Sequence, residues 1–192
     1  RAFEELLDIS LDPVASIGGA LWGVDNVDAP EVWNGGSIFP GTTGGGTTVA
    51  VIDTGVDLDH PEFAGRIVAG YDFVDNDSIA DDGEGHGTHV AGIIAGANDG
   101  QGITGVAHDT SIMPLRVLDN DGNGWVSDII SAVRWAADNG ADVINLSLGG
   151  DGSSQAMADA IRYASQRGSV VVMASGNTGS NSPDYPAAHA IN

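Results

Sequence analysis

Apolar strand-like runs alternate with helix-like segments from residue 47 onwards, and this alternation limits the fold more than any other feature of the chain. Short runs rich in β-branched residues predict buried strands at 47–53, 66–72, 111–118, 143–148 and 169–174. Helical spacing of small and apolar residues predicts helices at 88–97, 127–139 and 154–166. The pattern predicts an α/β fold in three layers, with a doubly wound, mostly parallel sheet and helices on both faces. Residues 1–46 show no such pattern and are expected to be irregular.

Polar and glycine residues follow several of the expected strands. The segments concerned are Asp53-Thr54-Gly55, Ser147-Leu148-Gly149 and Ser175-Gly176-Asn177. In an open parallel sheet, ligands bind beyond the carboxyl ends of the strands. We therefore expect the functional site at this edge of the sheet.

The charge balance excludes several classes of partner. The chain has 27 acidic and 6 basic residues, with a formal net charge of −21. So acidic a surface repels phosphate, which argues against nucleic acids and anionic membranes as partners. An aspartate-rich, lysine-free surface suits calcium-binding loops, and it also suits high salt. The chain has no cysteine, which excludes disulfides, thiol catalysis and thiolate zinc sites, and no apolar run reaches membrane-spanning length.

Asp53 ends the first strong strand and is followed by Thr54-Gly55. A carboxylate at that place is either a turn or capping residue, or a buried catalytic group that needs hydrogen-bond partners. Asp-Thr-Gly also carries the catalytic acid of aspartic proteases, whose mechanism needs a second such carboxylate. No second Asp-Thr-Gly or Asp-Ser-Gly occurs in the chain, and the α/β pattern argues against that all-β fold.

Two histidines lie three residues apart in Gly85-His86-Gly87-Thr88-His89. On one helix face they could bind a metal, but a zinc site would want a third ligand and often a glutamate between them. The other reading places His86 at the start of a helix facing a cleft and His89 in the core. In that reading, Gly85 and Gly87 let a substrate backbone come close. The small residues that follow His86 favour this second, catalytic reading.

Asn177 follows the last expected strand. An asparagine there is usually part of a turn, but its side-chain amide can also donate to a developing oxyanion.

Taken in this order, the segments resemble the subtilisin-like serine proteases (subtilases, peptidase family S8), particularly the thermitase-like branch. The resemblance covers residues 47–192. It rests on the aspartate motif Val49 to Asp57, the histidine motif His86-Gly-Thr-His-Val-Ala-Gly, the substrate-binding strand Val143 to Gly150 and the oxyanion motif Ala174-Ser-Gly-Asn. The resemblance implies that Asp53 orients His86, that His86 is the general base and that Asn177 donates to the oxyanion.

The resemblance also implies a cleft for an extended peptide, and hence peptide or protein substrates. Gly122, Asn123 and Gly124 would flank the acyl side of the peptide together with Ser147, Leu148 and Gly149. Ala174, Ser175 and Gly176 would form a wall of the first specificity pocket. Small residues in that wall leave room for a sizeable apolar side chain. The plain alternative is that these glycines only form turns.

The family's third motif, Gly-Thr-Ser-Met-Ala with the nucleophilic serine, is absent. Because the chain order of the triad is Asp, His, Ser, the serine is expected beyond Asn192. We interpret residues 47–192 as a catalytic domain truncated before the nucleophile motif, with its C-terminal part missing. Such a fragment is expected to be inactive by itself. The rival reading is a non-catalytic, calcium- and peptide-binding pseudo-protease.

Two loops are expected to bind structural calcium. The loop before the histidine motif carries Asp72, Asp75, Asp77 and Asp81, and its alternative is a solvated acidic loop. By resemblance, the carbonyl of Ile79 would join these ligands. A second site would use Glu62 and Asp99, with the carbonyls of Ala97, Gln101 and Ile103.

The remaining expectations come from the resemblance alone. It implies a secreted enzyme made with an inhibitory propeptide. Residues 1–46 are then an N-terminal extension and lead-in, and residues 1 to 20 suit the tail of such a propeptide.

Overall fold

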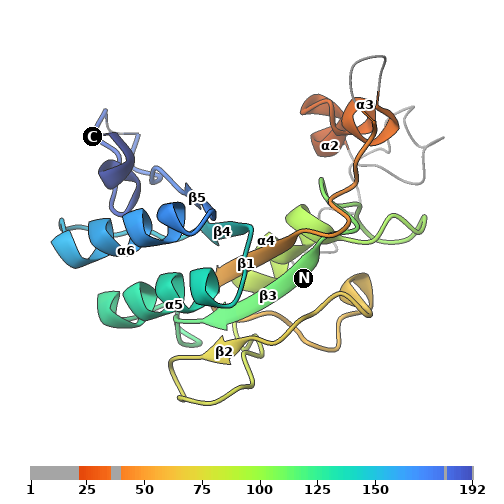
Figure 1. Ribbon diagram of the computed structural model, residues 1–192. Helices are drawn as coiled ribbons and strands as arrows, with labels where there is room; N and C mark the ends of the chain where they lie inside the picture. Colours follow the sequence, from red (N-terminus) through yellow and green to blue (C-terminus); the bar gives the residue numbers. More distant parts are fainter. Residues whose placement is uncertain (1–21, 36–39, 180, 192) are drawn as a thin grey trace.

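The computed structural model describes residues 22–35, 40–179 and 181–191, and the expected propeptide tail lies outside them (Figure 1). Its centre is a parallel sheet with the strand order β2-β3-β1-β4-β5. The strands are β1 (Thr48–Asp53), β2 (Tyr71–Asp72), β3 (Ser111–Arg116), β4 (Val143–Leu146) and β5 (Val170–Met173). The predicted α/β class with a parallel sheet is confirmed.

Helices cover both faces of the sheet (Figure 1). The helix α4 (His86–Ala95) packs on one face, and α5 (Val126–Asp138) and α6 (Gln155–Gln166) pack on the other. Alternate residues of β1 point to opposite faces, so that Val49 and Val51 join the α4 core while Ala50 and Ile52 join the α5–α6 core. In the part of the chain that the structure describes, no helix is both long and apolar enough to cross a bilayer.

The chain reverses its winding direction beside β1. It runs from β1 to β2 at one edge of the sheet and returns through α4 to β3 beside β1, and it then passes from β3 through α5 to β4 on the other side of β1. At such a switch point the connections after neighbouring strands diverge and leave a crevice at the carboxyl ends of the strands. The predicted site segments after β1 and β4 both open onto this edge.

The strand expected at 66–72 is largely absent. Only Tyr71–Asp72 forms β2, and Ile67 makes a single isolated bridge to Ile112. Ile112 and Arg116 of β3 form backbone hydrogen bonds with the segment on the β2 side of the strand. The backbone of Pro114, which lies midway between them, faces the same side. Proline has no N–H to give to the ladder, which explains why the pairing is interrupted there.

The irregular segment expected before β1 contains two short helices, α2 (Trp22–Asn26) and α3 (Ala29–Asn34). A tertiary contact holds α3: Trp33 Nε1 donates to the carbonyl of Val106 at 2.8 Å, and the Trp33 ring meets the His108 ring edge-on at 4.7 Å. Helices this short are marginal by themselves, so local sequence pattern did not reveal them.

Candidate active site

The alternation of β1 brings Asp53 under the start of α4. Asp53 shares a face with Val49 and Val51, and α4 covers that face with His86 as its first residue. The carboxylate is 0% exposed, whereas the His86 side chain is 47% exposed. His86 Nδ1 lies 2.7 Å from Asp53 Oδ1. The two side chains that the sequence singled out therefore form a direct pair.

Gly87 allows this close approach. A Cβ atom at Gly87 would collide with the Gly55 carbonyl and lie 3.1 Å from the Cβ of Asp53. The expectation that Gly87 makes room for a substrate backbone was wrong. Its missing side chain lets the first turn of α4 pack against the end of β1.

Burial controls the ionisation of Asp53. Burial raises the pKa of its carboxyl, and the hydrogen bonds from His86 and from the Thr54 amide oppose the rise. Oδ1 accepts the Thr54 N–H at 2.8 Å, while buried Oδ2 has no hydrogen-bond partner among the described groups. The ionised carboxylate therefore depends on His86 for much of its stabilisation.

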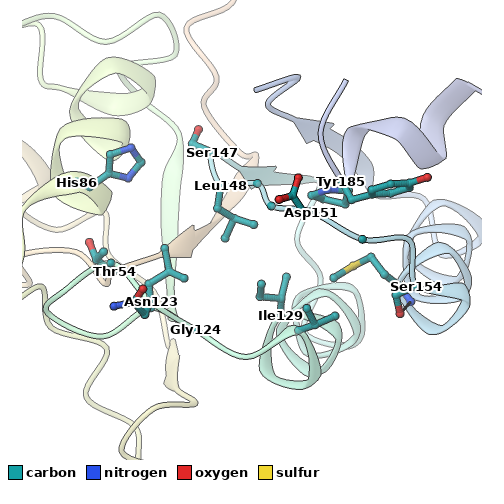
Figure 2. A pocket seen from close by; sticks show the side chains of 18 of the residues that line it. Thr54, His86, Asn123, Gly124, Ile129, Ser147, Leu148, Asp151, Ser154 and Tyr185 are labelled. Atoms are coloured by element: carbon teal, nitrogen blue, oxygen red, sulfur yellow. Dashed lines mark hydrogen bonds between the residues drawn. The ribbon is translucent and has the colours of Figure 1, made fainter. Parts of the chain in front are cut away.

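The hydrogen bond to Asp53 also fixes the imidazole tautomer. An ionised carboxylate only accepts, so the proton of neutral His86 is assigned to Nδ1 and the lone pair to Nε2. Figure 2 shows the imidazole directed into a groove. His86 is thus arranged to take a proton from a group in that groove.

The groove has a volume of ≈ 490 Å³ and runs from His86 to α6. All six residues predicted to flank an extended peptide line it together with His86: Gly122, Asn123, Gly124, Ser147, Leu148 and Gly149 (Figure 2). Apolar side chains add to the lining, among them Leu118, Ile129 and Met157. The arrangement could hold an extended chain with its backbone beside the glycines and apolar side chains in the groove.

The predicted residues after β5 lie apart from this lining. Among the described residues around the groove, neither Asn177 nor the segment 174–176 contributes to its lining, whereas Ser175 and Gly176 border a shallower pocket. The segment lies beside β4 because β5 pairs with β4, and the Asp184 N–H donates to the Ser175 carbonyl at 3.0 Å. The roles assigned to these residues stay predictions.

Asp82 is a site residue that the sequence reasoning missed. Its Oδ1 accepts the Thr54 hydroxyl at 2.9 Å and the Gly85 N–H at 2.8 Å. Its Oδ2 accepts both the amide and the hydroxyl of Thr88, at 2.9 and 2.5 Å. Asp82 therefore ties the loop after Asp53 to the first turn of α4. An aspartate just before a helix of small residues is a capping signal, and that signal could have found it.

Hydrogen bonds also keep Asp82 ionised. Burial acts to raise the pKa of its carboxyl, but the bonds from Thr88, Gly85 and Glu84 outweigh burial and hold the pKa below its usual range. Because this carboxylate is negative at neutral pH, its charge adds to the rise of the Asp53 pKa.

We predict that Asp82→Ala loosens the pairing of Asp53 and His86. Several donors on Thr54, Gly85 and Thr88 lose their acceptor, which should lower the free energy of unfolding by about 1–3 kcal/mol. A small shift of His86 should also slow any proton transfer that it performs by about tenfold or more. Urea unfolding and a hydrolysis assay would measure the two effects.

Asp82→Asn is the matched control for that substitution. The amide keeps one oxygen acceptor, so it should restore part of both losses. Wild-type values for both quantities in Asp82→Ala would contradict the positioning role.

Glu62 and the loop 97–103 come together as predicted. Glu62 Oε2 accepts the Ala97 N–H at 2.8 Å, and a Cβ atom on Gly102 would collide with Oε1. Burial raises the pKa of the Glu62 carboxyl, and the nearby charge of Asp99 adds to the rise. Asp99 Oδ1 in turn accepts the Gln101 N–H at 2.9 Å. The Glu62 carboxylate thus contacts loop 97–103, which carries the Asp99 carboxylate.

In the loop 72–81, an arginine occupies the acidic cluster. Asp72 Oδ2 and Asp75 Oδ2 each lie 2.7 Å from Arg116 Nη1. Arg116 and Asp72 are both buried, and the hydrogen bond that Arg116 donates to Asp72 raises the pKa of the guanidinium. The sequence reasoning did not connect Arg116, at the end of β3, with this loop.

The other predicted ligands of that loop make separate contacts. Asp77 Oδ1 accepts the Ile79 N–H at 2.7 Å, and Asp81 Oδ1 accepts the Leu58 N–H at 3.2 Å. Across residues 22–35, 40–179 and 181–191, no three acidic or histidine side chains gather as a metal site. His86, for which metal binding was one of the two readings, instead pairs with Asp53.

Sequence comparison relates the chain to known proteases. The profile of the subtilase family matches residues 44–190. Thermitase of Thermoactinomyces vulgaris is 45% identical over 167 residues, which cover 86% of this chain and 58% of thermitase. A thermophilic serine proteinase of Bacillus sp. (strain AK1) is 46% identical over 172 residues, covering 89% of this chain and 42% of that protein.

Solved structures support the same relationship. A cold-adapted subtilisin-like serine proteinase superposes with a TM-score of 0.70 at 43% identity, covering 83% of this chain and 57% of that one. Sphericase superposes with a TM-score of 0.73 at 33% identity, covering 86% of this chain and 56% of its own. The chain thus spans about half the length of the relatives that it matches.

Proposed function

The chain belongs to the subtilase family, and from this premise we propose that it supplies the acid–base part of a serine endopeptidase. The observation that carries the proposal is the 2.7 Å contact between buried Asp53 and His86, at the edge of a groove suited to a peptide. A relative and a solved structure that are both named as serine proteinases support it.

In the proposed mechanism, His86 Nε2 takes the proton of a serine hydroxyl as that oxygen attacks the peptide carbonyl. Asp53 holds the imidazole in the required tautomer and stabilises the imidazolium that forms. His86 then returns the proton to the leaving amine. The Asn177 amide is proposed to donate to the oxyanion. Because the family's serine motif does not occur in these 192 residues, the proposed mechanism requires a serine from elsewhere in the protein.

Labelling of the complete protein by a fluorophosphonate tests the proposal. The probe reacts with a serine that an adjacent base has activated, so we expect stoichiometric labelling and hydrolysis of peptides. Absence of both would favour the rival reading, a peptide-binding pseudo-protease.

We further propose structural calcium at the Glu62 loop. The support is the donor set: two carboxylates and several carbonyl oxygens suit a hard cation, and an added cation would relieve the repulsion between Glu62 and Asp99. For the loop 72–81, calcium would have to compete with Arg116 for Asp72 and Asp75.

We predict that chelation of calcium lowers Tm of the complete protein by ~5–10 °C. A shift of this size is expected when the free calcium concentration is well above Kd before the chelator is added. Calorimetry with and without a chelator would measure the shift. Glu62→Gln should abolish most of it, whereas Glu31→Gln, the same change at an exposed residue of α3, should not. An unchanged Tm on chelation would contradict both calcium sites.

We also propose that the protein is secreted and is made with an inhibitory propeptide. Both proposals rest on the family relationship. An N-terminal sequence determined on the protein from culture supernatant would test them.

A further inference from the structure

Asp184 lies between two segments that the proposed function assigns to the first specificity pocket. Its N–H donates to the carbonyl of Ser175 at 3.0 Å. On the other side, its Cβ lies 3.5 Å from where a Cβ on Gly149 would stand. Asp184 therefore bridges the segment that follows β4 and the segment that follows β5.

The carboxylate of Asp184 occupies space that a side chain would otherwise fill. A Cβ atom on Gly176 would collide with Asp184 Oδ2, and Gly176 has φ +96°, which also favours glycine. Because both neighbours are glycines, no side chain of theirs covers the carboxylate. In the described part of the chain, no arginine or histidine forms an ion pair with it.

The neighbouring groove that contains His86 has the same sign of charge, although Asp184 itself is not part of its lining. Its lining includes the carboxylates of Glu84 and Asp151 and no arginine within the residues described. Glu84 is held beside the base, since its Oε2 accepts the His86 N–H at 2.8 Å. A cationic side chain that enters the groove would thus meet fixed negative charges, and the basic groups among the described lining residues are the histidines His86 and His189.

From these observations, and resting on the proposed function, we propose that the enzyme selects substrates with a basic side chain in the first specificity pocket, where Asp184 pairs with it. Glu84 adds a second anionic contact beside His86. This replaces the expectation from small wall residues alone, which was a sizeable apolar side chain. The small residues of the pocket walls leave space for a long side chain, and the carboxylate of Asp184 favours one that carries a positive charge.

The size of the preference follows from pairing one charge of the substrate with the carboxylate of Asp184. A hydrogen-bonded lysine or arginine gains a charge-assisted contact that leucine lacks, which corresponds to about tenfold to a hundredfold in kcat/KM. A glutamate in the same place would face like charge, so its peptide should be cleaved most slowly.

The test compares peptides that differ only at the residue on the acyl side of the scissile bond: lysine, arginine, leucine and glutamate. The complete protein is assayed for kcat/KM on each. We expect the lysine-to-leucine ratio to be about tenfold or more, and Asp184→Asn to bring it close to one. Asp142→Asn is the matched control. This substitution removes the same charge at the other end of the strands, just before β4, where Asp142 accepts the Thr48 N–H.

A wild-type ratio near one, or a ratio unchanged by Asp184→Asn, would overturn the inference and leave the protease function intact. An equal fall of the ratio in Asp142→Asn would also overturn it, since the preference would then reflect net charge. Failure to cleave any peptide, together with no fluorophosphonate labelling, would instead overturn the proposed function and this inference with it.

Discussion

Replacing His86 with alanine is expected to lower kcat/KM of the complete protein on the order of 10⁴-fold and to abolish its fluorophosphonate labelling. The imidazole is the group in the groove that Asp53 orients, at 2.7 Å, and its exposed Nε2 is the acceptor for the nucleophile's proton. Without it, the serine hydroxyl keeps its proton and reacts slowly with both substrate and probe. Peptide hydrolysis and labelling would measure the loss.

His89→Gln provides a matched comparison in the same helix. His89 lies one turn further along α4, and the hydrogen bond to Asp53 belongs to His86. We expect this variant to keep its labelling, even if its Tm falls. Equal loss of labelling in both variants would indicate that α4 tolerates no change, and full labelling of His86→Ala would refute the base assignment.

The pairing of Asp53 with His86 follows from features that local sequence pattern contains. A strand of alternating residues fixes which face Asp53 shares with Val49 and Val51, and a parallel fold must cover that face with a crossover helix. The sequence also places His86 at the start of that helix. Periodicity and order along the chain therefore predicted the sheet and the edge at which both residues lie, whereas the prediction that they pair came from the resemblance to the subtilases.

The features that escaped prediction depend on contacts between residues far apart in sequence. Arg116 joins Asp72 and Asp75 across 44 and 41 positions, and Thr54 reaches Asp82 across 28. The interrupted strand before β2 is similar, since its cause is Pro114 in another strand. In each case the residue is ordinary in its local context, and only the folded arrangement assigns its partner.

Asp53→Asn is expected to lower kcat about 10⁴-fold with little change in KM, because an amide facing Nδ1 favours the wrong tautomer of His86. The amide NH₂ donates to Nδ1, so the proton moves to Nε2, where the base needs its lone pair. Steady-state kinetics on a peptide would measure the loss. A fall in kcat of less than tenfold would mean that Asp53 does not set the tautomer.

The free energy of unfolding of Asp53→Asn, relative to that of the wild type, should increase as pH rises. Burial raises the pKa of Asp53 above its ordinary value of 3.8, so the folded state binds this proton more tightly than the unfolded chain does. The stability that Asp53 contributes is complete below pH 3.8 and is lost as pH rises through the higher pKa of the folded state. Asparagine does not titrate, so the variant should gain on the wild type between acidic and neutral pH. Urea unfolding of both proteins across that range would show the gain. A difference that stays constant with pH, or that shrinks as pH rises, would mean that the buried carboxylate carries no such cost, and that activity and stability do not oppose each other at this residue.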